Sequence, residues 1–135
     1  MLLAQAARRI GIAEKLAAVS PDPRDQTRVV HPVCEILLAR ILAIACGYED
    51  ADDADTLRTD PALKAACERL PISGGDLASQ PTLSRLENRV SRTQLMRIAL
   101  ALGDAFIASF STPLRHLLLD LDDTDDPVHG AQQLA

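Results

Sequence analysis

The stretch VCEILLARILAIACG, residues 33–47, is the most apolar segment of the chain and decides what the other segments can pack against. Pro32, just before it, suits the first turn of a helix. The N–H groups of that turn have no partner within the helix, so proline's lack of an N–H costs no hydrogen bond there. Gly47 at its end is a common helix stop. The segment carries Arg40 in its middle and is shorter than the roughly 20 apolar residues that cross a membrane. The sequence therefore predicts a helix at the centre of a core.

Apolar residues at helical spacing continue on the N-terminal side of this stretch. Residues 2–19 follow that spacing, and Gly11 predicts a break between two short helices. The proline-rich segment 20–32 reads as a loop. After the central helix, Asp60 and Pro61 are the start signal of a capped helix, because a carboxylate accepts from the first N–H groups and proline fits the first position.

Two more helices are expected before the C-terminal segment. The stretch LASQPTLSRLENRV, residues 77–90, places Leu83 and Leu86 on one face of a helix. Residues 91–110 have apolar side chains at the same spacing, with Ser91 as the expected cap. We therefore predict a mainly α fold, a bundle of about six helices that ends in one β-strand.

The composition indicates one globular domain with an aliphatic core. The 135 residues are 47% hydrophobic and only 2% aromatic, so Leu, Ile, Val and Ala must fill the core. The N-terminal segment lacks the pattern of a signal peptide. We expect a cytoplasmic protein with no membrane association and with three reduced thiols, Cys34, Cys46 and Cys67.

The net charge of −5 is unevenly distributed along the chain. Residues 49–60 and 120–126 hold many of the acidic side chains, and the remainder is basic. Much of that positive charge is arginine between Arg85 and Arg97. A basic helical face near an acidic pocket suits a protein that holds a polyanion and metal ions together. Scattered solvated charge is the alternative interpretation.

The segment SQPTLSRLENRVSR, residues 79–92, looks like the recognition helix of small helix-turn-helix repressors. Its short and forked polar groups can reach phosphates and base edges. Arginines three to four residues apart also share one side of a helix. We expect DNA contacts from Gln80, Thr82, Arg85, Arg89 and Arg92. Two interpretations stay open, a DNA-binding regulator and an amphipathic helix with an ordinary polar face.

The stretch LLLDLDDT, residues 117–124, closes an apolar run with paired carboxylates. A run this short, between Pro113 and Pro127, predicts a buried strand. Because side chains alternate along a strand, Asp120 and Asp122 would share one face. A divalent cation such as Mg²⁺ would offset the repulsion between them there. A solvated acidic turn is the alternative.

The same stretch resembles the Asp-x-Asp-x-Thr motif of the haloacid dehalogenase-like phosphatases. That resemblance implies Asp120 as nucleophile, Asp122 as general acid/base and Mg²⁺ on the phosphate. Such enzymes place the motif at the start of an α/β domain, whereas a long helical region precedes it here. Asp125 also stands where that family has an apolar residue. A phosphatase fragment is the weakest alternative.

A second resemblance covers nearly the whole chain. Four segments occur in the order and spacing found in bacterial DDE-type insertion-sequence transposases, and look most like the thirteen-eighty insertion-sequence family. The segments are IGIAEKLAAVSPDPRDQTRVVHP (10–32), RILAIACGYEDADDADTLRTDPALK (40–64), LASQPTLSRLENRVSRTQL (77–95) and LLLDLDDTDDPVHGAQQ (117–133). Their joint occurrence is more specific than any one motif.

The transposase resemblance implies different functions for two regions of the chain. Residues 1–112 would bind transposon ends and assemble the complex, and residues 113–135 would begin a truncated RNase H-like domain. Asp122 would be the first catalytic acid and metal ligand, with Asp120 as second choice and Mg²⁺ or Mn²⁺ as cofactor. The implied partners are DNA, at the insertion sequence's terminal inverted repeats, and further copies of the chain. Because the family's other two acids have no positions here, we expect no strand cleavage by this chain alone.

Overall fold

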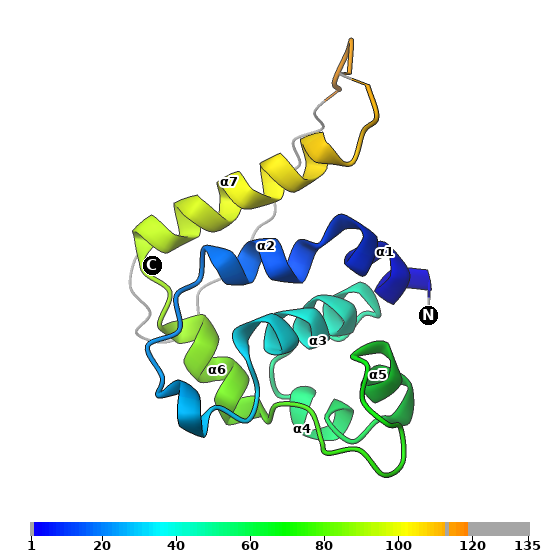
Figure 1. Ribbon diagram of the computed structural model, residues 1–135, viewed down its shortest axis with the longest axis vertical. Coiled ribbons are helices and arrows are strands. Elements are labelled where there is room, and N and C mark those ends of the chain that lie inside the picture. The colour runs from blue at the N-terminus through cyan, green and yellow to red at the C-terminus, as the bar shows by residue number, and fades with distance from the viewer. Residues whose placement is uncertain (1, 113, 119–135) are drawn as a thin grey trace.

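The computed structural model describes residues 2–112 and 114–118 and shows seven α-helices within them (Figure 1). In chain order they are α1 (Leu2–Ile10), α2 (Ile12–Ala18), α3 (Val33–Ala45), α4 (Ala54–Leu57), α5 (Pro61–Ala66), α6 (Gln80–Asn88) and α7 (Arg92–Ala108). One short 3-10 turn, η1 (Gln26–Arg28), lies between α2 and α3. The described part thus contains the expected helices, seven where about six were predicted.

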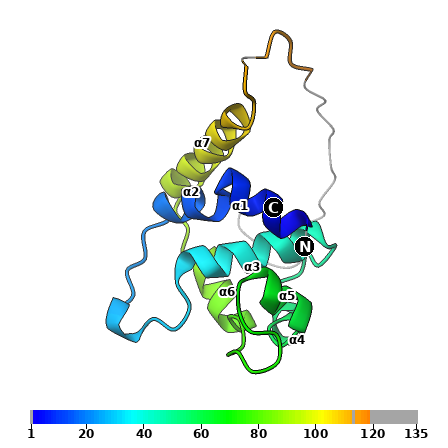
Figure 2. The ribbon, with the colours of Figure 1, turned by 45° about the vertical axis from the view of Figure 1, so that its right-hand side comes forward.

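The helix α3 lies at the centre of the bundle, as the sequence predicted. Helices α1, α2 and α5 pack on it, and both ribbon views show it in the middle of the molecule (Figures 1 and 2). Leu42, 4% exposed, belongs to one buried cluster with Ala4, Cys67 and Leu77. Val33 and Ile36 form a second cluster with Leu83 and Leu86 of α6. The two clusters place α1 and α5 on one part of α3 and α6 on another.

Local sequence signals set the predicted helix boundaries. Gly11, between α1 and α2, has a φ of 67°, a left-handed conformation that glycine adopts without strain. The Asp60 carboxylate accepts from the backbone N–H of Leu63 at 2.7 Å and caps α5. Ser91 caps α7 in a capping box with Gln94, in which each side chain accepts from the other residue's backbone N–H. The predictions at these three starts are confirmed.

Two basic side chains fix the loop between α5 and α6. Lys64 is only 4% exposed, and its Nζ donates to the carbonyl of Gly74 at 2.7 Å. Arg69 donates to both carboxylate oxygens of Glu35 on α3, each at 2.8 Å. A buried charge is stable only with such partners. These contacts therefore hold the loop against α5 and α3 in one conformation. That conformation brings the chain to the start of α6.

The other end of α6 is tied to α3 by Arg40. Its Nε donates to the carboxylate of Glu87 at 2.9 Å, and its Nη2 donates to the backbone carbonyl of Glu49 at 2.7 Å. Its Nη1 reaches two further carbonyls, those of Tyr48 and Asp50. One guanidinium group thus joins α3, α6 and the acidic loop that follows α3.

The helix α7 packs mainly along α2. Ala105 is the buried residue of this contact, and Ile98 and Ala101 on the same side are half-buried. The C-terminal half of α7 extends past the rest of the bundle in both ribbon views (Figures 1 and 2). None of the helices in the described residues is long and apolar enough to span a membrane.

The predicted β-strand is wrong for the part of it that the structure describes. Residues 2–112 and 114–118 contain no strand. Leu117 and Leu118, expected in a buried strand, are 57% and 95% exposed. A strand needs a neighbour for its backbone N–H and C=O groups, and no other described segment offers one. The fold ending in the first strand of an RNase H-like domain is therefore not observed.

Candidate nucleic-acid interface

The C-terminal half of α6 presents the arginines that the sequence singled out. Leu83 and Leu86 are buried against α3, which fixes the rotation of α6 about its own axis. Arg85 and Arg89, four residues apart, therefore project from one side of the helix end. Arg89 is the C-cap residue, so its positive charge also lies where the helix dipole favours a cation.

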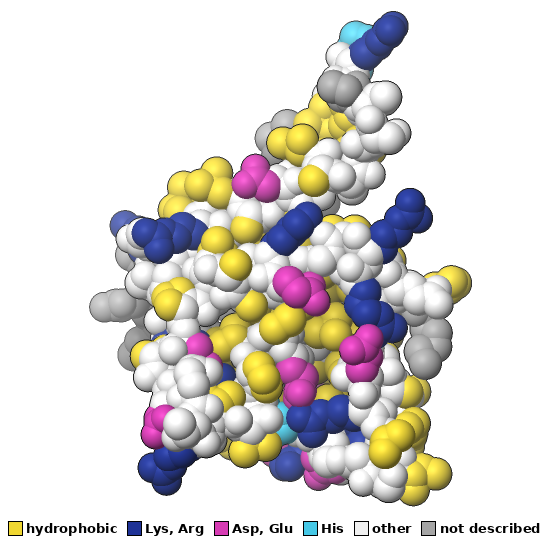
Figure 3. All heavy atoms as spheres, viewed as in Figure 1, with side chains coloured by type: hydrophobic (Ala, Val, Ile, Leu, Met, Phe, Trp, Pro, Cys, Tyr) yellow, Lys and Arg dark blue, Asp and Glu magenta, His cyan; other side chains and the backbone are white. Residues whose placement is uncertain are grey.

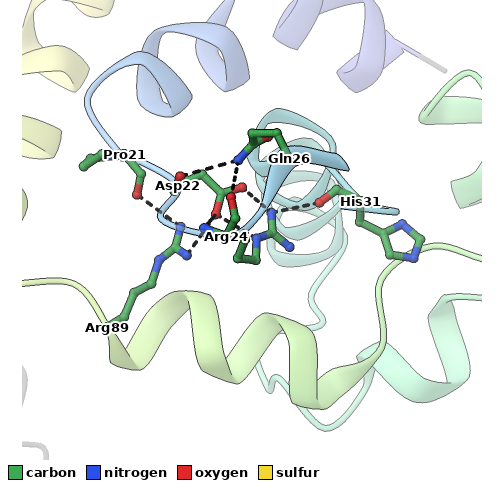
Figure 4. A network of polar contacts seen from close by, with 6 residues as sticks. All are labelled: Pro21, Asp22, Arg24, Gln26, His31 and Arg89. Atoms are coloured by element: carbon green, nitrogen blue, oxygen red, sulfur yellow. Dashed lines mark hydrogen bonds and ion pairs between the residues drawn. The ribbon is translucent and has the colours of Figure 1, made fainter. Parts of the chain in front are cut away.

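Asp22, in the loop between α2 and α3, holds two arginines in place (Figure 4). Its carboxylate accepts from Arg24 through Nε at 2.7 Å and Nη2 at 2.6 Å, a two-pronged contact. Arg89 donates to the same carboxylate through Nη1 at 3.2 Å. Arg24 also donates to the carbonyl of His31 at 3.0 Å, which fixes the guanidinium from a second side. Asp22 thus joins α6 to the loop before α3.

The charges of this cluster reinforce one another. The hydrogen bonds from Arg24, and more weakly those from Arg89, hold the pKa of the Asp22 carboxyl well below its usual range. The contact with Asp22 in turn raises the pKa of Arg24. Asp22 and Arg24 are therefore both ionised at neutral pH. Two guanidinium groups against one carboxylate leave the cluster positive.

An open depression of about 400 Å³ lies beside the cluster. It is lined by Arg24, Ile36, Thr82, Arg85, Leu86 and Arg89. Arg85 is exposed and has no hydrogen-bond or ion-pair partner among residues 2–112 and 114–118. Three guanidinium groups around one open space, with Arg85 available to a ligand, suit an anion such as a phosphate.

The N-terminal end of α6 has the opposite character. Asp55, from α4, accepts from the backbone N–H of Gln80 at 2.9 Å. The side-chain amide of Gln80 donates to Asp52 at 3.1 Å and to Ser84 at 3.0 Å. Asp55 occupies the first N–H group of α6, and both carboxylates would repel phosphates. A helix-turn-helix protein reads bases with the N-terminal residues of its recognition helix, and here that end is acidic.

The five predicted DNA-contact residues therefore do not lie together on one surface. Thr82, Arg85 and Arg89 line the depression, whereas Gln80 is engaged by Asp52 and Ser84. Arg92 is exposed at the first position of α7. Because α6 ends at Asn88 and α7 begins at Arg92, the expected shared helical side does not extend to Arg92.

Sequence analysis missed Asp22 and Arg24. Both lie in the segment that was predicted only as a proline-rich loop. The available signal was that Asp22 lies between two prolines and Arg24 follows two positions later, since an Asp side chain in a turn readily accepts from the backbone and side chain two positions on. Their link to Arg89 depends on chain segments far apart in sequence, which local patterns do not reveal.

The predicted metal ligands Asp120 and Asp122 lie outside the described residues. Within residues 2–112 and 114–118, no group of three or more His, Cys, Asp or Glu side chains is placed to hold a metal ion. The acidic side chains near α4 serve instead as the partners of α6 described above. The described part therefore supplies no donor set through which a metal-dependent step can be derived.

Comparison with known proteins adds one finding. The family model described as transposase DDE domain group 1 matches residues 1–135. Neither the curated proteins nor the solved structures contain a significant match to the chain.

Proposed function

Since the chain belongs to the transposase DDE domain group 1 family, we propose that its described part binds DNA at insertion-sequence ends during transposition. The family supports a role in DNA transposition, and the charges of the described residues support one place for the DNA contact. The proposed contact is the depression formed by Arg24, Arg85 and Arg89, with Asp22 as the residue that positions two of them.

The observation that carries the proposal is the division of charge along α6. Its C-terminal end carries Arg85 and Arg89 and lies beside Arg24, and its N-terminal end faces Asp52 and Asp55. A DNA backbone is therefore attracted to one end of this helix and repelled from the other. This polarity sets the direction in which α6 meets the duplex.

The contact is with phosphates rather than with base edges. A guanidinium group matches two phosphate oxygens with two parallel N–H donors, and such contacts position a protein without reading sequence. Gln80, the side chain best suited to adenine, already donates to Asp52 and Ser84. The charge pattern thus favours a transposition protein that contacts the DNA phosphates. It is less consistent with a regulator that reads bases through the start of α6.

Three finer elements of the proposal come from the sequence resemblance. They are the thirteen-eighty insertion-sequence family, the terminal inverted repeats as the DNA target, and residues 1–112 as the region that binds and assembles. We also propose that Asp122, with Asp120 as the alternative, ligates the Mg²⁺ or Mn²⁺ on which strand cleavage by the family depends. The support is the family and the spacing of the two acids. A bound divalent ion would supply charge neutralisation at the scissile phosphate.

The DNA contact is tested by fluorescence anisotropy with labelled duplex DNA carrying an insertion-sequence end. We expect Arg85→Ala to weaken binding several-fold and to reduce the salt dependence of the binding constant by about one counterion, as the loss of one phosphate contact predicts. Arg9→Ala is the matched control, because Arg9 is also an exposed helical arginine but lies on α1, away from the depression. If the two substitutions weakened DNA binding equally, the proposed site would be wrong.

A further inference from the structure

The outward face of α7 is apolar from Met96 to the end of the helix. Figure 3 shows hydrophobic side chains along this helix on the side that faces the viewer. Met96, Leu100 and Ile107 are 62%, 65% and 69% exposed. Phe110, just past the helix end, is 41% exposed and stacks edge-on against Phe106. Contiguous exposed apolar surface of this kind marks a contact with another molecule or segment.

Five residues on this face form a regular stripe. Met96, Leu100, Gly103, Ile107 and Phe110 follow one another in alternating steps of four and three residues. That spacing is the seam of a helix that pairs with another helix. The stripe lies nearly opposite the side that packs on α2, where Ala105 is buried. The helix therefore has one face for the bundle and a second face for a helical partner.

We propose that this stripe pairs with the same stripe of a second copy of the chain, with the two α7 helices antiparallel. The argument for a second copy is charge. Arg97 and Asp104 are exposed, lie on the same flank of the stripe and are seven residues apart. In an antiparallel pair that brings Leu100 opposite the partner's Gly103, each Arg97 falls within two residues, or about 3 Å along the axis, of the partner's Asp104. The self-complementary flank forms two ion pairs at once.

A parallel pair is disfavoured by the same side chains. In a parallel arrangement Arg97 on one flank would face the partner's Arg92 on the other flank of the stripe, because those positions pair across a parallel seam. Two such Arg–Arg contacts would repel. The charges therefore select the two-fold, antiparallel arrangement, in which identical surfaces meet.

Gly103 gives a second reason to expect a close partner. Glycine destabilises a helix interior relative to alanine, so its presence calls for a local cause. A Cβ built at Gly103 meets nothing within 4 Å, so the fold of one chain does not require glycine there. In the antiparallel pair Gly103 faces the partner's Leu100 at the middle of the seam, where a missing side chain lets the two helices approach.

The pairing is expected to be weak. A helix of 17 residues is about 25 Å long, and one pair of such helices buries less than the roughly 800 Å² per partner of a standard interface. We therefore expect a dimer that dissociates in the micromolar range. The inference gives the proposed homo-oligomer a surface, and it is independent of DNA binding.

Sedimentation equilibrium of the 135-residue chain, without DNA, tests the inference. We expect a reversible monomer–dimer equilibrium whose dissociation constant rises at least tenfold in Leu100→Glu. The matched control is Ile72→Glu, which places the same charge on an apolar side chain that is 93% exposed in a loop. Circular dichroism checks that both variants keep their helices. A chain that stays monomeric at high concentration, or a dimer that Leu100→Glu leaves intact, would overturn the proposal.

Charge reversal tests the antiparallel arrangement itself. Arg97→Glu alone and Asp104→Arg alone should each weaken the dimer several-fold, because each places like charges together across the seam. The double variant should recover most of the lost affinity, since the pairs are then restored with their signs exchanged. A double variant no better than the single ones would contradict the arrangement. Anisotropy measurements with the Arg85→Ala variant decide separately whether the DNA proposal holds.

Discussion

Arg89, at the end of α6, donates to the carboxylate of Asp22 at 3.2 Å across 67 positions of sequence. This contact joins the loop before α3 to the helix whose arginines line the basic depression. It also places Arg89 beside Arg24, which the same carboxylate holds at 2.6 Å. The chain thus uses one acidic side chain to hold two basic ones side by side.

Asp22 is expected to make stability depend on pH in acid. Its carboxyl pKa in the folded chain lies below the ordinary value of 3.8, so its stabilising contribution is complete above that value and is lost as the pH falls toward the folded pKa. In Asp22→Asn that loss should be absent, and the free energy of unfolding should fall less steeply below pH 3.8. Urea unfolding at a series of acidic pH values measures the difference. Glu49→Gln, an exposed acid whose side chain does not touch the cluster, should behave as the parent does.

Arg40 is expected to contribute measurably to stability. Arg40→Ala removes its bond to Glu87 and its bonds to three backbone carbonyls, those of residues 48, 49 and 50. Because water can replace part of these bonds, we expect a loss of about 1–2 kcal/mol in the free energy of unfolding. Denaturant titration gives the value. Arg9→Ala is the control, because Arg9 is an exposed arginine on α1. If Arg40→Ala lowered the free energy of unfolding no more than Arg9→Ala does, the Arg40 contacts would not contribute to stability.

Leu77 is expected to be among the most sensitive positions of the core. It is 2% exposed and packs in the cluster around Leu42. Leu77→Ala should cost about 2–5 kcal/mol, since the substitution removes buried surface and leaves a cavity. Leu118→Ala makes the same chemical change at a position that is 95% exposed, and should alter stability by less than about 0.5 kcal/mol. A large effect at Leu118 would contradict the exposure of this side chain in the structure.

The cysteines are expected to differ sharply in reactivity. Burial, with a smaller contribution from Glu35, raises the pKa of the Cys67 thiol to about 11 from an ordinary 9.0. At neutral pH this lowers its thiolate fraction about a hundredfold, in addition to the shielding that burial gives. Cys46 is exposed and should react first with iodoacetamide. Mass spectrometry of the time course shows the order, and Cys67 should be modified only under denaturing conditions.

The sequence predicted those features that depend on a few adjacent residues. Gly11, Asp60 and Ser91 mark helix ends through their own backbone preferences and caps, and the structure confirms all three. The apolar stretch around Leu42 identified the central helix because its composition requires burial. These signals need no knowledge of the rest of the chain.

Features that depend on distant segments were not predictable in this way. The apolar run at Leu117 and Leu118 has strand-like composition, but a strand also requires a neighbouring strand, and none exists in the described part. The meeting of Asp22 with Arg89 requires α6 to lie across α3, a placement that depends on the packing of Leu83 and Leu86 against α3. Arg85 and Arg89 were identified by charge and spacing, and whether they contact DNA remains a prediction.

Only three residues, 89–91, connect α6 to α7. Three residues span at most about 11 Å, so the start of α7 stays close to Arg89. If two chains meet through α7 about a dyad, this short link keeps the two basic depressions near the paired helices, in head-to-head orientation. DNA segments of opposite polarity would then be brought into register by the protein's own symmetry.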